Sequence, residues 1–241
     1  MDTFFPKYLF RYRSVGSSLA HTLDEINGKI WCATASTLND PFDGVAKATK
    51  KELATGFSKK KLVTTWGVAC FSEDWNGPTM WAHYANNHSG VCLVYDSNKL
   101  YHNAVNPVMH GYEDDVNATG VQLLQVEYLD SFPDSFTSDI EAIKTKSKHW
   151  SYEREWRLAI NYVSDETMPL KVGTTLDSEG SLTEILVNEN TDASSVRAII
   201  KVANSVDPNI SIVLVKPNLN EVGYKRIEVL SSKSFDPFGE I

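Results

Sequence analysis

The sequence has little that would direct it into a membrane. No apolar run approaches the roughly 18 residues that a bilayer-spanning helix needs. The N-terminal stretch MDTFFPKYLF has no basic region, and Pro6 and Lys7 interrupt its apolar part, so we do not expect a signal peptide. Low-complexity tracts and repeats of solenoid length are also absent. We therefore expect neither a membrane partner nor a repeat architecture.

Cysteine is scarce as well. Cys32, Cys70 and Cys92 are odd in number and far apart, and each lies in an apolar, strand-like run. Such residues are typical of small buried side chains in the reducing cytoplasm. A metal site built from cysteine and histidine would need closer spacing, so we assign no metal ligands to them.

Positive charge is in the minority, with 23 Lys and Arg against 31 Asp and Glu, and the net charge of −8 argues against a general nucleic-acid-binding surface. One local exception is a run of six lysines between positions 47 and 61. A run of this kind is most often the solvated face of a helix. The alternative is a docking patch for phosphate or RNA.

The remaining composition is that of an ordinary globular protein. With 42% hydrophobic and 22% charged residues, a chain of 241 residues can bury one sizeable core. We expect a single domain over 1–241, with a core region at 8–160 and a C-terminal strand–helix–strand–strand element at 182–230.

Short apolar strands alternate irregularly with short helices along the chain. Strands are expected at 8–14, 30–34, 66–72, 91–96, 121–129, 153–160, 183–189, 211–217 and 224–230, and helices at 17–29, 46–63, 78–87, 134–150 and 192–206. Because regular βαβ alternation is missing, the pattern predicts an α+β fold with a mixed, mostly antiparallel sheet.

The segment KHWSYEREWRLAI (148–160) carries an unusual row of charge. Read with period two, it places Glu153, Glu155 and Arg157 on one face of a strand, with the two carboxylates about 7 Å apart. Like charges at that distance raise one pKa, and the arginine lowers it again. An ionised carboxylate there could bind a sugar hydroxyl and stabilise an oxocarbenium-like centre. The structural alternative is a ladder of ion pairs with a neighbouring strand.

Three further clusters contain residues that could carry chemistry. They are Arg11-Tyr12-Arg13 on the first strand, the loop NDPFD (39–43) and the short helix MWAHY (80–84). Each also has a structural interpretation. Arginines on a strand can pair with acids elsewhere, Asn, Asp and Pro are common in turns, and Trp81 and Tyr84 can pack in a core.

Together these segments resemble a bacterial family catalogued as a domain of unknown function, number 2971. The resemblance rests on NDPFD, on MWAHY followed by HSGVCLVYD, and on KHWSYEREWRL, and it covers roughly residues 8 to 160. The family's name implies no activity.

A more remote resemblance is to ADP-ribosyltransferases that modify arginine. Arg11 on the first strand, Ser36-Thr37 after the second and Glu153-x-Glu155 on a later strand are similar in order to that family's motif. The resemblance implies an ADP-ribosyltransferase-like sheet, NAD as a nucleotide substrate, and a role in phage defence or as a toxin. The implied catalytic residues are Glu155 and Glu153, and the implied ligand-binding residues are Arg11, Ser36, Asn39, Asp40, Trp81, Tyr84 and Arg157.

Two other classes of function stay open. A metal-dependent hydrolase or nuclease could use Asp40, Asp43, Glu153 and Glu155 as oxygen ligands for Mg²⁺. A non-enzymatic sensor or partner-binding module would instead bury its polar clusters as ion pairs. We expect the NDPFD loop to lie against the face of Glu153, Glu155 and Arg157, because charges on an apolar strand need partners or solvent.

Overall fold

The computed structural model describes residues 5–34, 38–40, 66–105, 118–133, 136, 138–162 and 173–230. The chain forms two compact units. Unit 1 comprises 1–30, 72–103 and 177–241, and unit 2 comprises 31–71 and 104–176. The predicted single domain over 1–241 stays a prediction.

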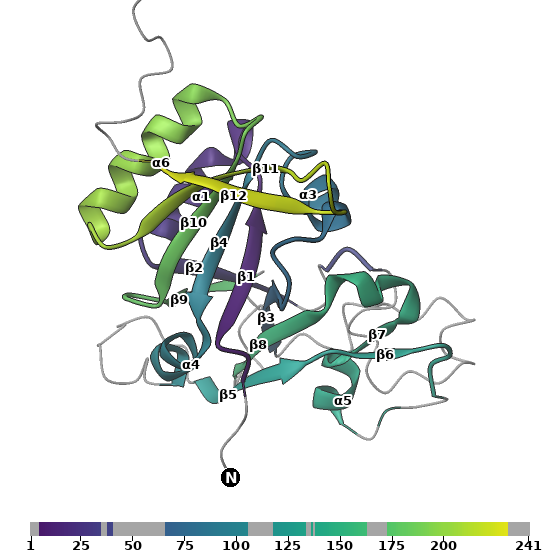
Figure 1. Ribbon diagram of the computed structural model, residues 1–241. Coiled ribbons are helices and arrows are strands. Elements are labelled where there is room, and N and C mark those ends of the chain that lie inside the picture. Colours follow the sequence, from purple (N-terminus) through teal and green to yellow (C-terminus); the bar gives the residue numbers. More distant parts are fainter. Residues whose placement is uncertain are drawn as a thin grey trace, which may run out of the picture. The chain divides into compact units, whose positions relative to one another are not determined.

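Unit 1 is built around five strands, which lie in the order β12-β11-β10-β4-β1 (Figure 1). Neighbouring strands are antiparallel except β10 and β11, which are parallel and are joined by a helix. The strands are β1 (Tyr8–Arg13), β4 (Val91–Asp96), β10 (Leu182–Asn188), β11 (Ser211–Pro217) and β12 (Tyr224–Val229).

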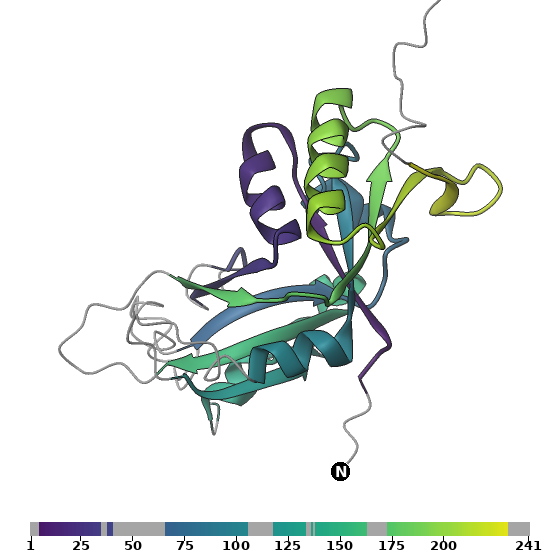
Figure 2. The same cartoon turned by 90° about the vertical axis from the view of Figure 1, so that its left-hand side faces the viewer.

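Helices cover both faces of this sheet. The helices α1 (Leu19–Ile26) and α6 (Ala193–Val206) lie side by side on one face (Figure 2). The short helix α3 (Pro78–Tyr84) packs on the other face, with Met80 and Trp81 in the core. The first helical turn of α6 is capped by Asp192, whose carboxylate accepts the backbone N–H of Ser195 at 2.9 Å. The 3₁₀ helix η1 (Gly16–Ser18) directly precedes α1 in the sequence, and the helix α4 (Ser97–Val105) directly follows β4.

Unit 2 contains a second group of paired strands. The strand β3 pairs with β2 and β8, β8 pairs with β5, and β2 pairs with β9. Two short strands, β6 and β7, lie between β5 and β8 in the sequence and form a separate parallel pair. The elements are β2 (Lys29–Thr34), β3 (Trp66–Ser72), β5 (Ala118–Gln125), β6 (Glu127–Leu129), α5 (Asp139–Ile143), β7 (Thr145–Ser147), η5 (Lys148–Glu153), β8 (Glu155–Tyr162) and β9 (Gly173–Asp177).

The α+β class and the mixed, mostly antiparallel strands confirm the sequence prediction. The predicted helix at 134–150 is wrong, because α5 ends at Ile143 and the chain continues as β7, which pairs with β6. Pairing with a distant strand has overridden local helix propensity. The strand at 173–177 and the helix at 97–105 were missed, and the helix predicted at 46–63 lies outside the described residues.

Within the part of the chain that the structure describes, no helix is both long and apolar enough to span a bilayer.

Candidate functional site

The predicted catalytic acids meet in unit 2, although they do not share a strand. The 3₁₀ helix η5 ends at Glu153, and Arg154 adopts a left-handed conformation (φ 45°) before β8 begins at Glu155. The period-two reading from Glu153 was therefore wrong. The left-handed turn still directs both carboxylates to one cation, Lys146 on β7.

Two cations hold the Glu155 carboxylate. Arg157 donates Nε to Oε1 at 2.8 Å and Nη2 to Oε2 at 3.0 Å, which is a bidentate pair. The ammonium of Lys146 lies 3.1 Å from Oε2 and also bonds Glu153. Arg157 further donates Nη1 to the backbone carbonyl of Ile143 at 2.6 Å, so the guanidinium links β8 to the end of α5.

This network, which we call the Glu155 network (Lys146, Glu153, Glu155 and Arg157), is withdrawn from water. Glu155 is 4% exposed and Arg157 is 0% exposed, and the other two are equally buried. Its two formal negative charges balance its two positive ones. Buried ions are tolerated only when they are paired and hydrogen-bonded, and these four meet that condition.

The electrostatics keep Glu155 ionised. Burial opposes ionisation, but the charges of Arg157 and Lys146 and the hydrogen bonds from Arg157 and the Cys70 thiol outweigh it, so the pKa of Glu155 falls to about 2. Burial raises the pKa of the Cys70 thiol, and the nearby Glu155 charge raises it further. Tyr128 fixes the backbone here, since its hydroxyl accepts the Glu155 N–H at 2.8 Å.

The arrangement limits the chemistry that Glu155 can perform. Both carboxylate oxygens already accept hydrogen bonds from cations. A ribose hydroxyl could reach the carboxylate only if Arg157 or Lys146 moved away, which would leave a buried charge without its partner. In this arrangement Arg157 and Lys146 hold the Glu155 carboxylate from both oxygens, at the positions from which a substrate would contact it.

Arg11 belongs to a different buried cluster, in unit 1. Its Nε lies 2.8 Å from Oε1 of Glu25 on α1, and Arg13 reaches the other oxygen at 2.7 Å. The hydroxyl of Tyr95 donates to the same carboxylate at 3.2 Å. Burial lowers the pKa of Arg13, while the Glu25 charge opposes that shift. Sequence reasoning missed Glu25, although its position beside Ile26 on the buried stripe of α1 was a usable signal.

The predicted stacking residues lie in the core of unit 1. Trp81 is fully buried, packs edge-on against Tyr12 with ring centroids 5.3 Å apart, and lies 5.2 Å from the ring of Tyr224. Its indole N–H donates to the carbonyl of Trp75 at 2.8 Å. Tyr84 is partly buried against the same cluster. A ligand would have to displace neighbouring rings to stack on Trp81.

The NDPFD loop is described only at its start. Asp40 is buried and Asn39 is exposed, while the adjacent Leu38 packs against the unit 2 core that includes Ala159 of β8. Ser36 and Asp43 lie outside the described residues. Contact between this loop and the Glu155 network stays a prediction. Among the described residues, no group of three or more His, Cys, Asp or Glu side chains is arranged to hold a metal ion.

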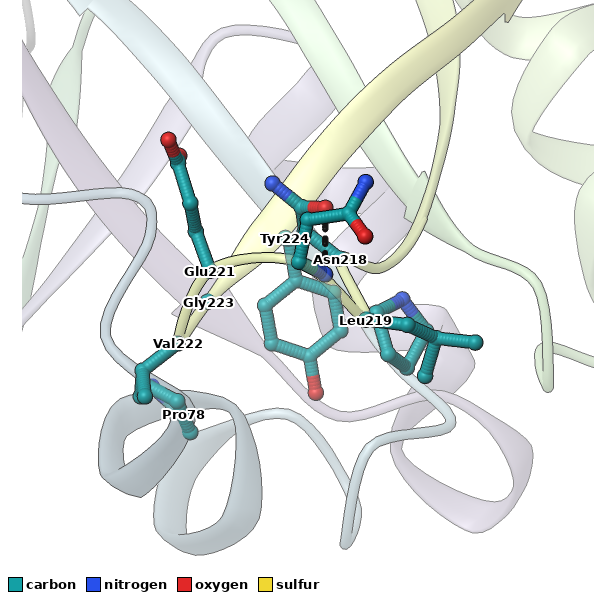
Figure 3. Close-up of a pocket in the computed structure, with 9 residues that line it drawn as sticks. Pro78, Asn218, Leu219, Glu221, Val222, Gly223 and Tyr224 are labelled. Carbon is teal, nitrogen blue, oxygen red and sulfur yellow. Dashed lines mark hydrogen bonds between the residues drawn. The ribbon is translucent and has the colours of Figure 1, made fainter.

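A surface depression in unit 1 was not foreseen from the sequence. It has a volume of about 440 Å³ and is lined by Pro78 and residues 217–224, the turn between β11 and β12 (Figure 3). Asn76 holds this turn by accepting the backbone N–H of Tyr224. The segment PNLNEVG contains no acid–base motif. The only sequence signal for the depression was the presence of aliphatic residues in this otherwise polar turn.

The fold and these clusters define an α+β protein whose predicted catalytic carboxylates lie in buried ion pairs. Residues 80–158 match the model of a family described as "Protein of unknown function (DUF2971)", and this stretch is less than half of the chain. The chain is similar to that family over this stretch, which begins within α3 and ends within β8. No curated protein and no solved structure matches the chain.

Proposed function

We propose that the protein is a non-enzymatic partner-binding module in which the charged clusters stabilise each unit. The observation that carries this proposal is the burial of Glu155 and Arg157, which are 4% and 0% exposed and bound to each other. A catalytic carboxylate must touch its substrate, and this one touches Arg157, Lys146 and Cys70. The three free cysteines support a cytoplasmic location as part of the proposal.

The competing hypothesis is an NAD-consuming ADP-ribosyltransferase of a bacterial defence or toxin system. Its support is the convergence of Glu153 and Glu155 on one ammonium group, because such an enzyme needs two acids close together. It also requires the Glu155 network to open when NAD binds. The two hypotheses predict different effects on stability and on NAD turnover when the charge of Glu155 is removed.

The test is the variant Glu155→Gln, which keeps the shape of the side chain and removes its charge. If the network is structural, Arg157 loses its buried partner and the free energy of unfolding falls by about 3–5 kcal/mol. For a chain of this length the melting temperature should fall by of order 10 °C. The matched control is Asp130→Asn, which removes an exposed acid paired with Lys148. This variant should leave the melting temperature unchanged.

Nicotinamide release from NAD is measured on the same preparations, with and without cell lysate as a source of acceptors. We expect none above the rate without protein. Turnover by the native protein that is lost in Glu155→Gln with an unchanged melt would instead establish the transferase.

A further inference from the structure

We draw no further inference here: the strongest candidate, the surface depression at the β11–β12 hairpin whose tip exposes Leu219 and Val222, carries none, because nothing in the structure shows what covers these two side chains and the charges of the hairpin are of both signs, with Glu221 at the tip and Lys216 and Lys225 at the base.

Discussion

At the scale of single residues, burial in ion pairs accounts for most of the charged residues that the sequence suggested as catalytic or ligand-binding. Glu155 and Arg157 were expected on an outward face, yet both are buried and the strand that carries them is covered on both sides. The structure places the two acids and the arginine in one ion-pair network. The pattern of residue types could not reveal Lys146, because that residue lies in a segment whose helical pattern concealed a short strand.

The stability of the protein should depend on the ionisation of Glu155 in acid. Its pKa in the folded state is about 2, against an ordinary value of 4.5, so its contribution is complete above pH 4.5 and is lost as the pH falls toward 2. We expect the urea midpoints of the native protein and Glu155→Gln to differ most at pH 7. The difference should shrink between pH 4.5 and pH 3, because over this range Glu155 binds a proton in the unfolded state while it stays ionised in the folded state. A constant difference from pH 7 to pH 3 would contradict a depressed pKa.

At the scale of elements, the strands were predicted well and the junctions were not. The strands at 66–72 and 91–96 are continuous apolar runs of 7 and 6 residues, and their short length favours a strand with both faces buried over a helix. The error at 134–150 arose where three short elements, α5, β7 and η5, follow one another within fifteen residues. Their boundaries depend on pairing with β6 and on the Glu155 network, which are tertiary contacts that no local pattern contains.

Gly223 should be indispensable to the β11–β12 hairpin. Its φ is +136°, and a Cβ there would lie 2.6 Å from the Nδ2 atom of Asn76. Gly180 is the matched control, because its φ is also positive (+69°) but its surroundings are open. Gly180→Ala should lower the free energy of unfolding by about 1–2 kcal/mol from backbone strain alone.

Gly223→Ala combines the steric conflict with backbone strain at its own φ of +136°, and it should lower the free energy of unfolding by more than the control does. Urea unfolding of both variants measures the difference. Equal losses would show that the Asn76 side chain moves aside without cost.

At the scale of the whole molecule, each unit carries its own buried ionic cluster. Glu25 with its two arginines lies in unit 1, and the Glu155 network lies in unit 2. The order of the motifs along the sequence suggested that Arg11 and Glu155 serve one site. The ionic partners that the structure gives them are instead within their own units. Sequence order alone could not distinguish these arrangements, since the chain alternates between the units.

This alternation should make unfolding cooperative. The strand β2 begins in unit 1 and continues in unit 2, and β3 crosses the boundary in the other direction, so neither unit is a continuous segment that can unfold alone. We expect a single calorimetric transition whose measured and van't Hoff enthalpies agree. Glu155→Gln in unit 2 and Gly223→Ala in unit 1 should lower that same transition temperature. Two transitions, each moved by only one of these variants, would show that the units unfold independently despite the strands they share.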